Sequence, residues 1–346
     1  MRCPLRAMDR SPLHSMTNAK TSSGAPVKKT LLRPENLAKL FAEFLAVMFA
    51  GGIGLAADTT GISLILFPEI AALAFDVFSR PRGKWATQPL RLIITPTTTA
   101  ALGVIVTRHW EYGAIAITAI TLLSLVTLKL LRSNIGAAIS AGVLPMVLGT
   151  TSWVYPIAIF SGLVVLAATL TLWKQFDPHI YLSEGNKESQ IIDAAETPPK
   201  DRFWIFALTG FVLVSGAAAQ ATDLRFLLFP PLIVVAYELF GHPELPGWMS
   251  RPVLFPLVCF LTASVGMFAN STLHAGFLGV SFTMVCSIAI FRAFKVHMPP
   301  ALAVGLIPFV IVHPTFWYPI SVSLGASALI ASASVYTSIK RTQRVR

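Results

Sequence analysis

Long apolar stretches, separated by short polar turns, run through most of this sequence. Most of them are close to the roughly 20 residues that a helix needs to cross the hydrocarbon layer of a bilayer. Backbone polar groups in that layer must be hydrogen-bonded within the chain, which favours helices. The strands of a membrane β-barrel would alternate apolar and polar residues, and these stretches do not. We therefore expect an all-α, polytopic helical membrane protein.

The apolar pattern predicts a similar series of segments in each half of the chain. Two of these segments, 136–150 and 299–312, are short, so they either re-enter the membrane or span it. The predicted segments are 38–56, 61–78, 92–108, 113–130, 136–150 and 153–173 in the first half, and 203–221, 224–240, 253–269, 275–291, 299–312 and 317–338 in the second.

The second half of the chain matches the first at an offset of 163 residues. Chance alignment of apolar segments would match Leu and Ala, whereas these matches fall on Trp, Gly, Tyr and Pro. We therefore expect two tandem membrane modules, 38–173 and 203–339, with about five to six hydrophobic helices each. The aligned pairs include Trp85 with Trp248, Gly103 with Gly266, Gly142 with Gly305, and Tyr155-Pro156 with Tyr318-Pro319.

Composition and charge add an orientation to this picture. Hydrophobic residues make up 54% of the chain and charged residues 12%, against about 25% charged residues in soluble domains. The net charge of +11 is concentrated in a basic tail at 1–37 and another at 340–346. Basic residues flank membrane segments on the cytoplasmic side, so we expect both tails and the polar linker, 174–202, in the cytoplasm. The basic loops of both modules then share that side, which favours parallel repeats.

These features predict an integral protein of a bacterial inner membrane, with an organelle membrane as the open alternative. Residues 1–37 are expected to form a flexible tail, and their Arg and Ser content leaves a transit peptide open. The expected partner is the lipid bilayer. Nucleic acid is not expected, because no recognition fold is predicted for it. A homo-oligomer is open as well.

A basic cluster stands where one predicted segment ends and the next begins. Arg292, Lys295 and His297 precede Pro299 and Pro300. Proline suits the first turn of a helix, and a helix N-terminus presents unpaired N–H groups that attract anions. The cluster is therefore a candidate anion-binding site, although basic residues at a cytoplasmic membrane edge are expected without any ligand.

The matching stretch of the first module has diverged. It keeps both basic positions, as Lys129 and Arg132, but Asn134 replaces the histidine and Gly136-Ala137 replaces the two prolines. Arg132 and Asn134 are secondary candidates for anion contact. If the chain has one anion site, we expect it in the second module.

Three acids lie in or beside the apolar segments, where charged groups are costly and often functional. Asp76 and Glu238 occupy equivalent positions near segment ends, so they are candidates either for interfacial ion pairs or for coupling to a proton. Glu69 lies deeper in its segment and aligns with Pro231 of the second module. It is a candidate proton-coupling acid without a symmetric counterpart.

The sequence offers no catalytic constellation. It contains no HExxH, P-loop or GxSxG motif, and Cys3, Cys259 and Cys286 lack the spacing of metal ligands. We therefore expect neither an enzyme nor a bound metal or cofactor.

Each half of the chain resembles the HPP family of integral membrane proteins, named for a His-Pro-Pro motif that follows a basic helix end. The stretch His297-Met298-Pro299-Pro300 is similar to this motif with one inserted residue, and 61–67 and 88–91 also resemble the family. Some plant and cyanobacterial members are described as nitrite transporters, so the resemblance implies a small anion as substrate.

The leading hypothesis is a secondary transporter or channel for a small inorganic anion, with nitrite as the first candidate. The alternative is a non-transporting membrane scaffold or sensor partner that acts through the linker and the basic tails. The two hypotheses differ in what they require of the linker, which is a binding surface only in the second.

Overall fold

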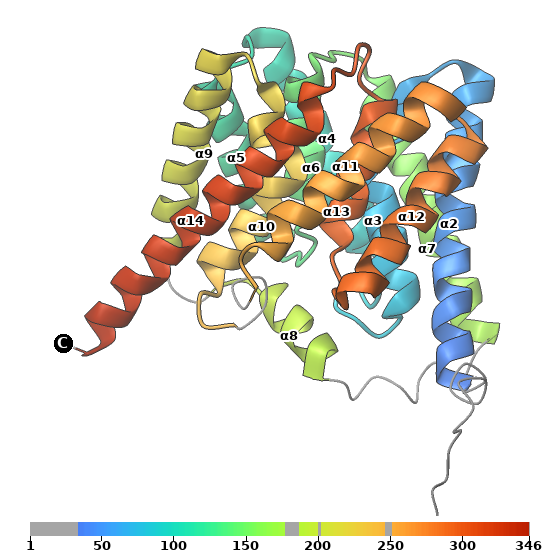
Figure 1. Cartoon of the computed structure of the whole chain (residues 1–346), viewed down its shortest axis with the longest axis horizontal. Coiled ribbons are helices and arrows are strands. Elements are labelled where there is room, and N and C mark those ends of the chain that lie inside the picture. Colours follow the sequence, from blue (N-terminus) through green and yellow to red (C-terminus); the bar gives the residue numbers. More distant parts are fainter. Residues whose placement is uncertain (1–33, 177–186, 200–201, 246–250, 346) are drawn as a thin grey trace, which may run out of the picture.

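The computed structural model describes residues 34–176, 187–199, 202–245 and 251–345, and these residues form helices without strands (Figure 1). Most of the predicted N-terminal tail lies outside the described residues. The first half contains α2 (Pro34–Thr60), α3 (Pro68–Ser79), α4 (Pro89–His109), α5 (Ala114–Leu130), α6 (Ala137–Leu148) and α7 (Val154–Phe176). Helix α8 (Lys187–Ala195) lies in the linker. The second half contains α9 (Phe203–Thr222), α10 (Pro230–Gly241), α11 (Leu254–Leu273), α12 (Phe277–Phe294), α13 (Pro299–Leu306) and α14 (Trp317–Val345).

The prediction of an all-α membrane protein is confirmed. Within the described residues, 7 helices are long and apolar enough to cross a bilayer: α2, α4, α7, α9, α11, α12 and α14. Their outward faces carry exposed apolar side chains such as Phe203, Phe206 and Val214 of α9, each at least 70% exposed. Burying such a surface in lipid is favourable, because it removes apolar area from water.

Two predicted segments are interrupted near their start. Segments 61–78 and 224–240 were expected to be helical throughout, yet α3 begins only at Pro68 and α10 only at Pro230. Proline disfavours the α conformation in the residue before it, and Phe67 and Phe229 are indeed extended, with ψ of 110° and 147°. The preceding residues form the short 3-10 helices η1 (Ser63–Ile65) and η3 (Arg225–Leu228).

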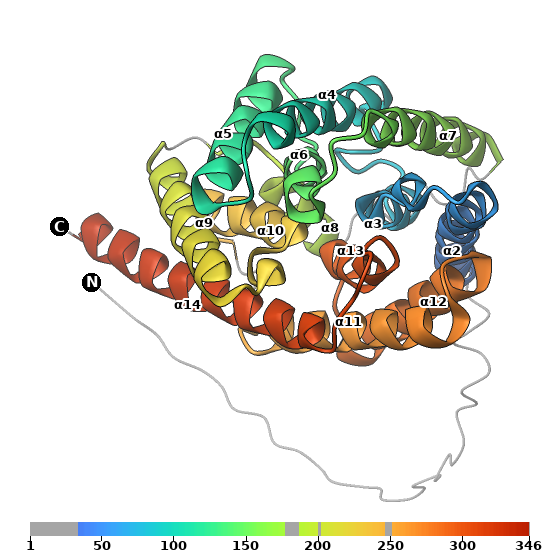
Figure 2. The ribbon, with the colours of Figure 1, turned by 90° about the horizontal axis from the view of Figure 1, so that it is seen from above.

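Four short helices form the centre of the molecule, and the long helices surround them. Figure 2 shows α3, α6, α10 and α13 inside a ring of the other membrane helices. Helices α3 and α6 are almost wholly buried and have 12 residues each. Twelve residues extend about 18 Å, well short of the roughly 30 Å hydrocarbon layer. The chain therefore crosses the centre as half-length helices joined to non-helical residues.

The short segment around α6 spans the molecule and does not turn back. Near the start of α4, the indole N–H of Trp85 donates to the backbone oxygen of Asn134 at 2.9 Å. Near the end of α4, Arg108 donates to the backbone oxygen of Thr151 at 2.9 Å. Residues 134–151 thus extend between the two ends of α4. These contacts favour spanning over re-entry for segment 136–150.

Several close contacts recur at the offset of 163. The backbones of α4 and α6 approach so closely that a Cβ on Gly103 would overlap the carbonyl oxygen of Gly142, and Gly266 meets Gly305 in the same way. Glycine permits such close approach of helices in lipid. These pairs support the tandem repeat, which stays a prediction.

Equivalent tyrosines make equivalent contacts as well. The hydroxyl of Tyr155 donates to the backbone oxygen of Ala141 at 3.0 Å, and that of Tyr318 donates to Val304 at 2.6 Å. Each tyrosine therefore anchors the start of its long helix, α7 or α14, to the short helix beside it. The domain boundaries stay a prediction from the sequence.

The two halves are interleaved in space. Helices α2 and α3 pack against α12 and α13, while α9 and α10 pack against α5 and α6. Figure 2 shows α2 beside α12 and α9 beside α5. At one of these junctions, a Cβ on Gly54 would touch Val280 and the backbone of Gly276. The first two helices of each half thus complete the core of the other half.

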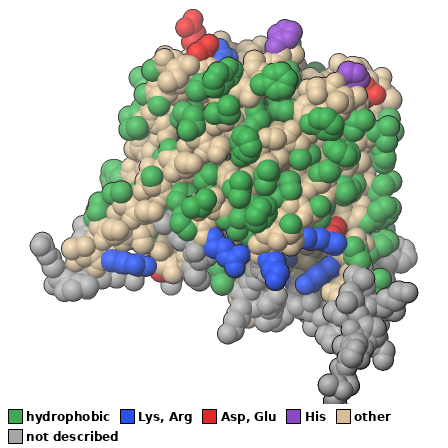
Figure 3. Space-filling model, in the orientation of Figure 1, with side chains coloured by type: hydrophobic (Ala, Val, Ile, Leu, Met, Phe, Trp, Pro, Cys, Tyr) green, Lys and Arg blue, Asp and Glu red, His purple; other side chains and the backbone are tan. Residues whose placement is uncertain are grey.

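The molecule has two distinct ends. We call the lower end in Figure 1 the linker end, since α8 and the C-terminus of α14 lie there, and the upper end the far end. Figure 3 shows Lys and Arg side chains gathered along the linker end, with the apolar band above them. Chain order places Arg108 and Arg225 at the far end.

Candidate functional site

Helix α3 carries the charged groups of the candidate site. Every residue from Pro68 to Phe78 is buried, yet this stretch includes Glu69 and Asp76, and Arg80 follows the helix. Glu69 and Asp76 are seven residues apart, so they lie on the same face of the helix, about 10 Å from each other along its axis. Arg80 follows Asp76 by four residues, about one turn of a helix. One face of a central helix therefore carries two carboxyl groups and a guanidinium group on the way to the linker end.

Arg80 is the centre of an ion-pair cluster at the linker end. Its Nε and Nη2 donate to the two carboxylate oxygens of Asp76, both at 2.9 Å. Its Nη1 donates to Asp193 at 2.9 Å, and Nη2 also donates to Glu196. Arg80, Asp76 and Glu196 are 6%, 1% and 3% exposed. Charges buried in this way depend on their partners, because an unpaired charge in a dry interior is costly.

His297 joins this cluster from the other half of the chain. Its Nε2 lies 3.3 Å from Oδ1 of Asp76, and its ring stacks on Phe75 at 5.1 Å between centroids. We call Asp76, Arg80, Asp193, Glu196 and His297 together the Arg80 cluster. It joins the first half, the linker and the second half at one place.

The linker is docked against the linker end of the membrane helices. Lys84 donates to the hydroxyl of Thr197, and Nε2 of His242 lies 2.6 Å from the backbone oxygen of Thr197. Pro199 lies against Gly241 at the end of α10, so closely that a Cβ there would meet its ring. These contacts tie the linker to both α3 and α10 through the residues that follow them.

One guanidinium in the Arg80 cluster faces three carboxyl groups, so the cluster favours an additional proton. Burial raises the pKa of Glu196 well above its usual range, and the charges of Asp76 and Glu238 raise it further, against the opposing effect of Arg80. Glu238 therefore acts on the same cluster as Asp76, from α10. Of the two equivalent acids of the sequence, Asp76 belongs to the cluster and Glu238 lies within electrostatic reach of it.

The predicted basic cluster does not converge on a common point. Arg292 is paired with Glu43 of α2, and its side chain is 51% exposed. Lys295 is exposed and caps α12 in the left-handed conformation, with φ of 54°. Of the three basic residues, only His297 reaches the buried cluster, and it meets a carboxylate there. Pro299 and Pro300 begin α13, as predicted.

The first-module candidates are likewise separated. Arg132 is exposed and left-handed, with φ of 49°, in the same position relative to α5 as Lys295 to α12. Asn134 is half-buried, and its backbone oxygen accepts from the indole of Trp85. The backbone of Asn134 thus joins the turn between α5 and α6 to the loop before α4.

Glu69 occupies the interior at the first turn of α3. It is 3% exposed, and the hydroxyl of Ser140 on α6 donates to its Oε1. Its other oxygen, Oε2, has no hydrogen-bond partner among the described residues. None of the ion pairs that the structure describes includes Glu69. The first half therefore holds a buried carboxyl group that is only half satisfied.

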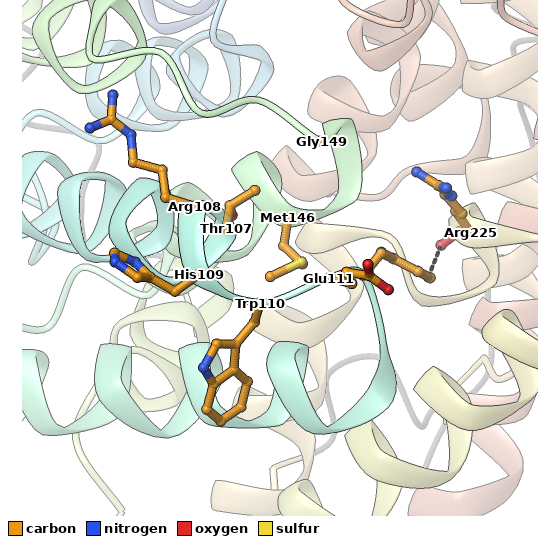
Figure 4. Close-up of a pocket in the computed structure, with 9 residues that line it drawn as sticks. Thr107, Arg108, His109, Trp110, Glu111, Met146, Gly149 and Arg225 are labelled. Carbon is orange, nitrogen blue, oxygen red and sulfur yellow. Dashed lines mark hydrogen bonds between the residues drawn. The ribbon is translucent and has the colours of Figure 1, made fainter.

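A hollow of about 350 Å³ opens at the far end (Figure 4). The residues that line it come from the C-terminal end of α4, from the turn between α4 and α5, from the C-terminal part of α6 and from η3. Its basic side chains are held by aromatic rings: Arg225 lies 4.8 Å from the ring of Tyr112, and Arg108 lies 5.2 Å from the ring of Trp153. Burial raises the pKa of Tyr112 to about 12. The lining residues are Thr107, Arg108, His109, Trp110, Glu111, Tyr112, Met146, Gly149 and Arg225.

Sequence reasoning missed part of this arrangement. Arg80 was assigned only to a basic loop, and Glu196 only to a polar linker, because nothing in the local sequence shows that they meet. The spacing of Asp76 and Arg80, four residues apart, is a signal for an ion pair on one helix face. The hollow depends on η3, whose position follows from the packing of the two halves.

The fold and the site define an integral membrane protein with a buried charge cluster between its halves. Among the described residues, no group of three or more His, Cys, Asp or Glu side chains is placed to hold a metal ion. Comparison with protein families, curated proteins and solved structures finds no match to this chain. Its function must therefore be argued from its own geometry.

Proposed function

We propose that this chain is a membrane transporter for a small inorganic anion, with its linker end in the cytoplasm. The observation that carries the proposal is the contrast between the two ends of the central helices. At the linker end the Arg80 cluster joins both halves and the linker, while a hollow opens at the far end. A transporter closed on one side and accessible from the other has this form, since substrate sites lie between repeats.

The half-length helices support transport more than a scaffold does. Discontinuous helices in transporters place helix termini inside the membrane, where their partial charges face ions. Pro68 and Pro230 begin α3 and α10 within the molecule, so the positive ends of both helices lie in its interior. A scaffold would gain nothing from such interruptions, which leave backbone groups without helical partners.

An anion is the preferred substrate class because the hollow contains Arg108 and Arg225. Arg292 and His297 each face a carboxylate in the structure, so we place the first contact with the anion in the hollow. We propose that the parts that move follow the interleaved packing and not the two sequence modules. One part would be α2 and α3 together with α11 to α13, and the other α9 and α10 together with α4 to α6.

Uptake by proteoliposomes tests the proposal. Purified protein should take up one or more of nitrite, nitrate, chloride and sulfate faster than empty liposomes do. Arg225→Gln should lower the initial rate about tenfold, which corresponds to about 1.4 kcal/mol of lost interaction. Arg82→Gln, at an exposed position of the linker end, is the control and should leave the rate unchanged. Uptake equal to that of empty liposomes for every anion would end the proposal.

The proposed orientation has its own test. In a variant with its native cysteines replaced, Arg82→Cys should react only with reagents that reach the cytoplasm. His313→Cys, on the loop before α14, should react with impermeant reagents added outside intact cells. The basic residues along the linker end favour this result. The opposite labelling pattern would reverse the orientation of the chain.

The alternative function, a scaffold that acts through the linker, needs the polar face of the linker to be available. Asp193 and Glu196 instead face Arg80 inside the molecule. A pull-down with and without residues 187–199 separates the two ideas, because partners that persist without these residues do not bind the linker.

A further inference from the structure

We infer that Glu69 is the proton-binding residue of this protein and that one proton crosses the membrane on it with each anion. The inference rests on the proposed transport function and adds to it a coupling ion, a site and a stoichiometry. The motivating geometry is a carboxyl group at mid-depth with one oxygen bonded and the other without a partner.

The surroundings of Glu69 favour its neutral form. An ionised carboxylate in a dry interior is very costly unless a cation or several donors compensate for it. Glu69 has one side-chain donor, Ser140, besides the backbone N–H groups at the start of α3, and it has no basic partner among the described ion pairs. A proton on Oε2 removes the charge and leaves Oε1 as the acceptor for Ser140. The site is therefore built to hold a proton when it is closed.

The groups around Glu69 do not replace this proton. Helix α3 packs against α2, α6, α7 and α13. The phenol of Tyr155 on α7 and that of Tyr318 on α14 are within electrostatic reach of Glu69, and both are neutral partners. Of the charged groups on these helices, Glu43 of α2 interacts with Lys39, with Arg292 of α12 and with His297. Asp58 lies at the other end of α2, beside Gly276.

The position of Glu69 connects the two ends of the molecule. Met146 lines the hollow and lies on α6 six residues beyond Ser140, which is about 9 Å along the helix. In the other direction, Asp76 lies about 10 Å along α3 on the same face as Glu69. In the inferred path the proton enters from the hollow, binds Glu69 and leaves toward Asp76 and His297. The carboxyl group releases the same proton that it bound.

The stoichiometry follows from the asymmetry between the halves. The position equivalent to Glu69 is Pro231 in the second half, which cannot bind a proton. The second half therefore has no counterpart of Glu69, and the additional proton that the Arg80 cluster favours is held at Glu196 in the linker. A single proton carried with a monovalent anion moves no net charge, so transport of nitrite or chloride should be electroneutral.

Infrared difference spectroscopy of the full-length protein tests protonation without requiring transport. The wild-type protein at neutral pH should show the C=O band of a protonated carboxyl group that disappears in Glu69→Gln. Asp76→Asn should keep this band and is the matched control on the same helix. If Glu69→Gln leaves every protonated-carboxyl band unchanged, Glu69 is ionised and the inference is wrong.

Proteoliposome uptake then tests coupling. An inward proton gradient should drive accumulation of nitrite by the wild-type protein, with empty liposomes reporting leakage of nitrous acid. Glu69→Gln should abolish this accumulation but keep exchange of nitrite at equal pH on both sides.

The outcomes distinguish the two proposals. Lack of wild-type uptake overturns transport, while the infrared band still reports on Glu69 itself. Accumulation driven by the gradient in Glu69→Gln overturns the coupling role and leaves transport intact.

Discussion

Replacing Arg80 by methionine is expected to destabilise the folded protein by about 3–5 kcal/mol, the usual cost of leaving buried charges without their partner. Asp76 and Glu196 would lose the guanidinium that neutralises them, and the linker would lose its main ionic contact with α3. Thermal unfolding of the purified protein in detergent measures the loss. Proteolysis within residues 187–199 should become faster at the same time, because docking of the linker depends on the same residue.

Two comparisons make this result specific. Arg82→Met changes an exposed arginine in the same loop and should cost less than about 1 kcal/mol. The triple variant Arg80→Met, Asp76→Asn and Glu196→Gln removes the charges together and should recover part of the stability, since no buried charge is then left unpaired. Equal unfolding temperatures for Arg80→Met and Arg82→Met would show that the Arg80 cluster contributes nothing to the fold.

Alanine at Gly103 or at Gly266 is expected to destabilise the protein by about 1–3 kcal/mol in each case, through overpacking. The added Cβ would overlap the carbonyl oxygen of Gly142 or Gly305, and a backbone carbonyl cannot move aside as a side chain can. The helices of each pair, α4 with α6 and α11 with α13, would have to separate. Thermal unfolding again measures the effect.

Gly210 provides the matched control for these substitutions. It also lies inside a membrane helix, α9, but an added Cβ there would have nothing within 4 Å. Gly210→Ala should therefore be neutral, or stabilising by up to about 1 kcal/mol through helix propensity. Similar losses for Gly103→Ala and Gly266→Ala, against none for Gly210→Ala, are what the tandem repeat predicts. A neutral Gly103→Ala would contradict the close helix approach.

The sequence was sufficient to predict the helices of this fold but not how they assemble. Length and hydropathy identify a spanning helix because lipid leaves the backbone few structures other than a helix. The predicted ends agree within a few residues with those of α4 (Pro89–His109) and α5 (Ala114–Leu130). The interruptions before Pro68 and Pro230 could have been predicted from the sequence. Proline disfavours the helical conformation in the residue before it, and the same Phe-Pro pair stands at matching positions of both halves. The interleaving of the halves had no local signal, because it depends on which faces of long apolar helices meet.

The candidate site was also predictable only in part, because the sequence indicates some of its residues but not which of them meet. Asp76 and His297 were each singled out as residues, yet 221 positions separate them, and only the folded chain brings them together. The anion hypothesis grouped His297 with Arg292 and Lys295 because they are neighbours in sequence. In the structure the next helix begins at once, so these side chains point to different surroundings. Glu69 could be nominated because an acid in an apolar segment is unusual, whereas its bond to Ser140 could not.

The interleaved packing has a consequence for how the chain is made. Synthesis delivers α2 and α3 to the membrane roughly 200 residues before α12 and α13 exist, an interval of about 10–40 s at usual rates of elongation. During that interval α3 is too short to cross the bilayer, and Asp76 has neither His297 nor Glu196 beside it. The nascent first half must therefore be sheltered by insertion or chaperone factors until the second half arrives. Two half-chains made separately should each be degraded, and should persist only when made together.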